Sequence, residues 1–285
     1  MFGVTLGCLY GLLAIGYTMV YGVLRLINFA HGDLLMVSAY FAFFGIAMFH
    51  LPWPVSFAIA VVLTGFLGVL IDRGAYKPLR RSPRISALIT AIGLSFLLEN
   101  LALVIIGGRP KSFPMPSLFE GAFTGAGVQI PYLSLWVIGI TAVLLVVVLL
   151  IVHRTRVGMA MRALSRDVET VRLMGVDADR VISFTFVLGS ALAAAGGMMW
   201  CMKYPALEPF MGIIPGLKAF VAAVLGGIGN VAGAALGGLL LGLAEILIVA
   251  IKPEWSGYRD AIAFGVLIAI LLTRPTGILG EELPE

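Results

Sequence analysis

The chain has 285 residues, of which 60% are hydrophobic and 12% charged, with a mean hydropathy of +1.06 and a formal net charge of +4. A soluble globular domain carries about 25% charged residues, so this composition excludes one and predicts an all-α polytopic membrane protein. Cytoplasmic loops of membrane proteins carry an excess of Lys and Arg, which explains the positive net charge without a nucleic-acid partner.

Nine apolar runs are expected to form helices in the membrane. They cover residues 2–24, 34–49, 55–71, 85–106, 132–152, 181–202, 213–228, 231–251 and 258–273. The runs 34–49 and 213–228 are short for a full crossing, so we expect about eight to nine transmembrane or re-entrant helices. The first run has no basic segment ahead of it, so no cleavable signal peptide is predicted. Because the chain begins almost inside that run, it stays open whether native leading residues precede it.

A polar segment, residues 25–33, interrupts the first apolar stretch. A charge in the middle of a bilayer costs at least about 2.5–3.5 kcal/mol, so Asn28, His31 and Asp33 are expected to face the protein interior or a water-filled cavity. Gly32 permits a sharp backbone change, and Asn28 or Asp33 can cap a broken helix whose amide dipoles point at an anionic group. The alternative is a short cytosolic turn in which these side chains are simply solvated.

Two later apolar runs contain isolated acids, Glu99 (followed by Asn100) and Glu245. An unpaired ionised carboxylate is costly there, so each acid is expected to be protonated, paired or facing a pathway. An interhelical hydrogen bond explains each acid as well as substrate contact does. The similar surroundings of Glu99 and Glu245 hint at an internal repeat without a fixed register.

Lysine and arginine in short loops predict the orientation. Basic residues cluster in the connections 73–84 and 153–180, which are therefore expected in the cytosol, whereas the connection 107–131 is expected outside. Because successive spans cross the membrane in alternating directions, the amino terminus is expected outside and the tail after Arg274 inside.

The connection 153–180 is a long polar segment with six arginines and four acids. Its apolar residues recur at helical spacing, which predicts a short amphipathic helix lying against another surface. These residues are Met161, Leu164, Val168, Val171 and Met174. Gly158 before this helix and Gly175 after it are expected to end it, with Gly175 in the left-handed conformation. The alternative is a solvated loop that obeys the positive-inside rule.

Glycines near the carboxyl end recur every four residues, which predicts close packing of helix backbones. They are Gly229, Gly233 and Gly237, and the pair Gly238 and Gly242. The sequence contains no phosphate-binding Gly-x4-Gly-Lys-Ser/Thr motif, so any ATP hydrolysis belongs to another chain. The two cysteines and three histidines have no ligand spacing, so neither a metal site nor a disulfide is predicted, and a catalytic set for a membrane enzyme is missing.

Several motifs together resemble the permeases of branched-chain amino acid ABC importers. They are GYTMVYG at 16–22, INFAHGD at 27–33, RA at 162–163, ETVRLMG at 169–175 followed by Val176, FVLGSALA at 186–193 and LGGIGNVAG at 225–233. The ETVRLMG stretch resembles the coupling loop Glu-Ala-Ala-x-x-x-Gly of ABC permeases, with Thr170 and Val171 in place of the two alanines. The resemblance implies contact with an ATPase through Arg162, Ala163, Arg166, Glu169, Gly175 and Val176. It also implies a substrate pathway at Asn28, His31, Gly32 and Asp33. The isolated polar residues Glu99, Asn100 and Glu245 are further candidates for this pathway.

The resemblance implies a single transmembrane permease domain over residues 1–285, with the coupling loop 153–180 inside it. The expected partners are a second homologous permease, two ABC ATPase subunits and a periplasmic substrate-binding protein, in the bacterial inner membrane. This chain would bind no cofactor, because ATP is used by the partner subunits. It would not be an enzyme.

The substrate and the arrangement of subunits stay open at this point. Branched-chain or related amino acids are the expected substrates, and permeases of the same family for urea or small amides are the alternative. A heterodimer of permeases is favoured over a homodimer. The residues alone also permit a stand-alone secondary transporter or channel with Asp33, Glu99 and Glu245 as ion sites, which would work without ATPase subunits.

Overall fold

The computed structural model describes residues 1–80, 82–125, 128–274 and 276–280, and these residues are mainly helical. The α-helices are α1 (Phe2–Leu24), α2 (His31–Ala47), α3 (Trp53–Ile71), α4 (Arg84–Ile106), α5 (Tyr132–Arg154), α6 (Arg156–Arg166), α7 (Val168–Leu173), α8 (Ala178–Lys203), α9 (Ile213–Gly226), α10 (Val231–Ile251) and α11 (Arg259–Thr273). Seven helical segments are long and apolar enough to cross a membrane, and α2 and α9 are shorter apolar helices. The nine predicted runs and the all-α class are therefore confirmed.

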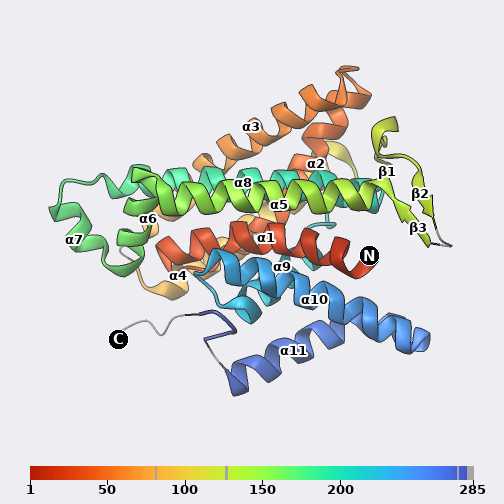
Figure 1. The fold of residues 1–285 in the computed structure, drawn as a ribbon. Helices are drawn as coiled ribbons and strands as arrows, with labels where there is room; N and C mark the ends of the chain where they lie inside the picture. The colour runs from red at the N-terminus through yellow and green to blue at the C-terminus, as the bar shows by residue number, and fades with distance from the viewer. Residues whose placement is uncertain (81, 126–127, 275, 281–285) are drawn as a thin grey trace.

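Short elements lie at the two ends of the helix bundle. A π-helical turn, η1 (Asp72–Tyr76), and a 3-10 turn, η2 (Lys77–Leu79), follow α3; two further 3-10 turns are η3 (Ser117–Phe119) and η4 (Pro253–Tyr258). Strand β1 (Lys111–Ser112) pairs with β4 (Ala206–Leu207), and β2 (Ala122–Gly125) pairs with β3 (Val128–Pro131), both antiparallel. Figure 1 shows β1–β3 at one end of the bundle and α6 and α7 at the other. The connections 107–131 and 153–180 therefore lie on opposite sides, as the charge distribution predicted.

The short helices α2 and α9 are too short to span a bilayer. Their 17 and 14 residues correspond to about 26 Å and about 21 Å of helix, against a hydrocarbon core of about 30 Å. Their first turns meet: a Cβ on Gly32 would lie 3.0 Å from Gly216 Cα and 2.5 Å from the carbonyl oxygen of Gly212. The absence of side chains at these positions allows the two helices to start against each other.

The structure corrects the predicted geometry of residues 25–33. The sharp backbone change occurs at Arg25, which has a φ of 52°, and Gly32 lies inside α2. Neither Asn28 nor Asp33 caps α2, because its N-cap residue is Ala30 and no side chain caps it. Asn28 instead accepts a hydrogen bond of 2.8 Å from the Tyr76 hydroxyl. Asn28 lies two residues before the N-cap position of α2, and its side-chain oxygen bonds to Tyr76 of η1 instead of to an amide of α2.

The helices form two sets with the same sequence of long, short, long and long members, α1–α4 and α8–α11, in which η4 and α11 together make the last long segment of 21 residues. Helix α1 packs on α9 and α10 as α8 packs on α2 and α3, and α9 packs on α10 and α11 as α2 packs on α3 and α4. Figure 1 shows α1 and α8 starting at opposite ends of the bundle. This is an inverted repeat of the kind found in transporters. The expected internal repeat is therefore present, but Glu99 on α4 and Glu245 on α10 do not occupy equivalent helices in it.

Glycines allow α1 and α10 to approach along much of their length. A Cβ on Gly7 would lie 2.7 Å from Leu239 Cα, and Gly238 and Gly242 contact the backbone of α1. Gly233 and Gly237 face the backbone of α9. Gly229 is different: it has a φ of 98° and nothing lies within 4 Å of its absent Cβ. The predicted close packing is confirmed for the other four glycines, whereas Gly229 belongs to the turn between α9 and α10.

Candidate functional site

A cavity of about 170 Å³ lies where the first turns of α2 and α9 meet, beside α4. Its lining includes Tyr17, Phe29, Gly32, Asp33, Ile92, Ser95, Phe96, Glu99, Gly212, Ile213, Gly216 and Leu217. The buried carboxylate of Asp33 accepts a hydrogen bond of 2.5 Å from Ser95 Oγ, and the carboxyl group of Glu99 lies within hydrogen-bonding reach of it. Two carboxyl groups and a hydroxyl inside an apolar wall can bind a donor group such as an ammonium.

The predicted residues around this cavity have different positions. Gly32, Asp33 and Glu99 line it, while His31 lies behind it with its ring 4.9 Å from the ring of Tyr17. The exposed fractions of Asn28, His31 and Asp33 are 2%, 1% and 2%, so the alternative of a solvated turn is wrong. Asn28 bonds to Tyr76 of η1, His31 packs on Tyr17 of α1, and Asp33 bonds to Ser95 of α4.

Asn100, the next residue on α4, does not line this cavity. Its side chain is exposed, and its amide donates a hydrogen bond of 2.7 Å to the carbonyl oxygen of Phe96 in the same helix. One position along a helix changes the direction of a side chain by about 100°. The sequence pair 99–100 is therefore divided between the interior and the surface.

Glu245 belongs to a second cavity, of about 260 Å³, between α1, α9, α10 and α11. Its carboxylate lies 3.0 Å from Lys218 Nζ and accepts a hydrogen bond of 3.2 Å from the Tyr10 hydroxyl. Lys218 also lies 2.7 Å from Asp260 Oδ1 at the start of α11. Lys218 and Asp260 were not predicted from the sequence, although a single lysine in the apolar run 213–228 was a usable signal.

The amphipathic segment consists of two helices, α6 and α7, and not of one. The chain breaks at Asp167, whose φ is −152° and whose carboxylate accepts hydrogen bonds from the backbone amides of Glu169 and Thr170. The Thr170 hydroxyl also donates to this carboxylate, and these bonds hold the pKa of Asp167 below its usual range. An aspartate that caps a new helix in this way ends the preceding one.

The two glycines of this segment differ in their roles. Gly175 has a φ of 80°, as predicted for a residue that turns the chain back towards the membrane. Gly158 does not precede the helix but lies in the first turn of α6, where Thr155 is the N-cap and accepts from its amide. A Cβ at Gly158 would collide with carbonyl oxygens at the end of α5. This glycine therefore permits the sharp join between α5 and α6.

Comparison with known proteins decides the family. The family described as "Branched-chain amino acid transport system / permease component" matches residues 1–271. The chain belongs to this family. The permease is 41% identical to the "High-affinity branched-chain amino acid transport system permease protein BraD" of Pseudomonas aeruginosa, over 98% of this chain and 94% of the relative.

Two further relatives agree with this membership. The permease is 41% identical to the "High-affinity branched-chain amino acid transport system permease protein LivH" of Escherichia coli (strain K12), over 98% of this chain and 94% of the relative. It is 28% identical to the "Probable branched-chain amino acid transport permease protein LivH" of Methanocaldococcus jannaschii, over 95% of this chain and 88% of the relative. All three relatives are named as transport permeases and none as an enzyme, and this chain is likewise a multi-pass membrane permease.

The permease presents one side of α6 and α7 outward. Met161, Leu164 and Val171 are buried, whereas Leu173 and Met174 are 85% and 79% exposed. The predicted contact residues Ala163, Arg166, Glu169 and Gly175 are also exposed, and Val176 is half-buried. Arg162 donates a hydrogen bond of 2.5 Å to the carbonyl oxygen of Val152 and so fixes α6 to α5. The segment thus has an anchored side and a free side.

Proposed function

We propose that this chain is the permease subunit of an ATP-driven importer that carries branched-chain or related amino acids into the cytoplasm across the bacterial inner membrane. The observation that carries the proposal is the family match over residues 1–271, with relatives named for branched-chain amino acid transport. The chain forms one transmembrane domain in which the connection 153–180 serves as the coupling loop. Its partners are two ABC ATPase subunits, a second homologous permease and a periplasmic substrate-binding protein, and this chain binds no cofactor itself.

The exposed side of α6 and α7 supports a contact with an ATPase. Helix α7 lies at one end of the bundle (Figure 1), and the exposed Leu173 and Met174 are at its carboxyl end, four and five residues after Glu169. Apolar side chains of this size, exposed next to charged ones, are typical of a protein interface. ATP-driven closure of the ATPases would then move α7 and switch the bundle between its two openings.

The cavity between α2, α4 and α9 suits an amino acid. Asp33 and Glu99 offer carboxyl oxygens to an ammonium group, and the first turn of α9, which contains no acid, offers amide dipoles to a carboxylate. Asn28 and His31 do not line the cavity, and their contacts with Tyr76 and Tyr17 hold the start of α2 in place. Glu245 and Lys218 form a buried ion pair between α10 and α9. We assign this pair a structural role in the pathway.

The first experiment is affinity purification of the chain from its native membrane, followed by mass spectrometry. Recovery of two ATPase subunits and a second permease supports the importer. Isolation of the chain alone, with transport retained after reconstitution without ATP, would instead establish a self-sufficient carrier. Uptake of labelled leucine and of labelled urea by the reconstituted complex separates the two substrate classes.

The coupling assignment is tested by Glu169→Lys. Uptake should be lost and ATP hydrolysis uncoupled while the protein stays in the membrane; Glu120→Lys, an equally exposed charge reversal at the opposite end, is the control. Gly175→Pro should have the same effect, because proline cannot adopt a φ of 80°. Normal uptake by both coupling variants would remove the assignment.

The pathway assignment is tested by Asp33→Ala and His31→Ala. Both should impair transport while the ATPase subunits still co-purify, because neither residue lies near α6 or α7. Asp33→Ala removes the partner of Ser95, and His31→Ala removes the packing on Tyr17. Unchanged uptake kinetics in both variants would exclude this cavity from the pathway.

A further inference from the structure

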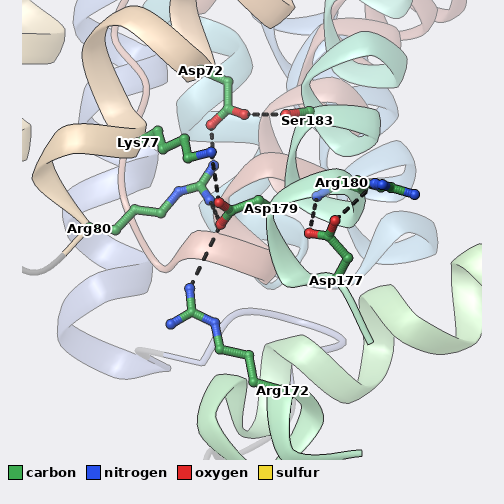
Figure 2. Close-up of polar contacts among 8 residues, drawn as sticks. All are labelled: Asp72, Lys77, Arg80, Arg172, Asp177, Asp179, Arg180 and Ser183. Atoms are coloured by element: carbon green, nitrogen blue, oxygen red, sulfur yellow. Dashed lines mark hydrogen bonds and ion pairs between the residues drawn. The ribbon is translucent and has the colours of Figure 1, made fainter. Parts of the chain in front are cut away.

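A cluster of charged residues joins the π-helical turn η1 to the start of α8. Asp72 is fully buried, and its carboxylate accepts hydrogen bonds of 2.5 Å from Arg80 and 2.6 Å from Ser183 Oγ (Figure 2). The second guanidinium nitrogen of Arg80 lies 2.5 Å from Asp179 Oδ1. Arg80 therefore connects a carboxylate inside the protein to one near its surface.

Asp179 is the point at which the coupling segment joins this cluster. Figure 2 shows three cations converging on its carboxylate: Lys77 at 2.8 Å and Arg80, from η2 and its C-cap, and Arg172 at 3.7 Å, from α7. Arg172 belongs to α7, the helix that carries the exposed Leu173. A displacement of α7 consequently changes the charges around Asp179 and, through Arg80, around Asp72.

The other end of the same π-helical turn contacts the start of α2. Tyr76 is 1% exposed, and its hydroxyl donates a hydrogen bond of 2.8 Å to Asn28 Oδ1. The carbonyl oxygen of Asn28 in turn accepts a hydrogen bond of 3.1 Å from the amide of His31, the first residue of α2. Two residues further on, Asp33 faces the cavity. Single π-helical turns such as η1 are frequent at functional sites in helices.

We infer that η1 is the transmission element of the permease, which converts a movement of α7 into a movement of the first turn of α2. Contacts run continuously from Arg172 through Asp179, Arg80 and Asp72 to Tyr76 and Asn28, by ion pairs and hydrogen bonds joined by short stretches of backbone. Rigid packing on both sides of η1 favours two discrete arrangements over gradual deformation. Tyr76 is a positioning residue in this scheme, because it acts on substrate only through α2. The inference rests on the proposed function.

Tyr76→Phe tests the inference, because it removes one hydroxyl and preserves the packing of the ring. Tyr40→Phe is the matched control: the Tyr40 hydroxyl is also buried and has no hydrogen-bond partner among the described residues. The assay is the complete complex in proteoliposomes, with leucine uptake and ATP hydrolysis measured on the same vesicles. Loss of one buried hydrogen bond shifts a two-state equilibrium about fivefold. We therefore expect leucine taken up per ATP hydrolysed to fall about fivefold in Tyr76→Phe and to stay at the wild-type value in Tyr40→Phe.

Arg172→Ala gives an independent measurement at the exposed end of the contacts. It should also lower uptake per ATP, and the double variant with Tyr76→Phe should be no worse than the more affected single variant, because both interrupt one connection. Full coupling in Tyr76→Phe, or effects that multiply in the double variant, would overturn the inference. A wild-type complex that takes up leucine without ATP would overturn the proposed function instead, so the two failures are distinguishable.

Discussion

The buried pair Lys218–Glu245 allows a quantitative prediction about stability. The two side chains are 5% and 1% exposed, and Lys218 Nζ lies 3.0 Å from Glu245 Oε1. Removal of one member of a buried pair leaves an uncompensated charge, which costs about 3–5 kcal/mol. Lys218→Met should therefore lower the free energy of unfolding by about that amount. In the double variant Lys218→Met/Glu245→Gln neither charge of the pair remains, so most of this loss should disappear, because replacing both members of a buried ion pair is often neutral or stabilising.

The control for this prediction is Asp260→Asn. Asp260 pairs with the same Nζ at 2.7 Å but is 52% exposed, so its loss should cost less than about 1 kcal/mol. The assay is reversible unfolding of the purified permease in mixed micelles with increasing SDS, followed by the fluorescence of its four tryptophans. The reasoning about an uncompensated charge is refuted if Lys218→Met unfolds like the wild type. It is also refuted if the cost of the double variant equals the sum of the costs of Lys218→Met and Glu245→Gln measured singly.

Three further predictions concern backbone packing and the coupling segment. Gly238→Val should abolish folded protein, because a Cβ there meets the α1 backbone, whereas Gly139→Val, with open space around it, should leave the size-exclusion profile unchanged. Gly175→Ala should cost about 1–2 kcal/mol of local stability at its φ of 80°, seen as faster amide exchange in α7; unchanged exchange would contradict this. The pKa of the capping carboxylate of Asp167 is lowered, mainly by the hydrogen bond from the Thr170 hydroxyl. The cap therefore stabilises α7 at pH values above the ordinary pKa of aspartate, and this stabilisation is lost as the pH falls through the pKa of the folded state. Exchange in α7 should accelerate over that acidic range, and Asp167→Asn should remove the pH dependence.

The membrane helices could be predicted from sequence because the signal is local. A run such as 132–152 has the length and hydropathy to cross a bilayer whatever surrounds it, and α5 forms there. The short lengths of runs 34–49 and 213–228 likewise indicated α2 and α9 as incomplete crossings. The left-handed Gly175 followed from the need to turn the chain after an amphipathic helix.

The pairing of polar groups could not be predicted, because it depends on which helices become neighbours. Glu245 was expected to be paired, protonated or facing a pathway, but only the contact of α10 with α9 identifies Lys218 as its partner. Asn28 has the sequence features of a helix cap, yet Tyr76 from a distant turn takes its side chain. The split at Asp167 was missed for a different reason: the apolar spacing continues through it, and Asp167 was counted only among the four acids of the segment and not considered as a helix cap.

The meeting of α2 and α9 by their first turns has an electrical consequence. Each helix start carries the equivalent of about half a positive elementary charge, and here two of them face each other inside a low-dielectric bundle. Asp33 offsets this charge at α2, whereas the first turn of α9 contains no acid. Because two like charges repel at this short distance, the contact between the helix starts depends on the nearby carboxyl groups of Asp33 and Glu99 to offset them.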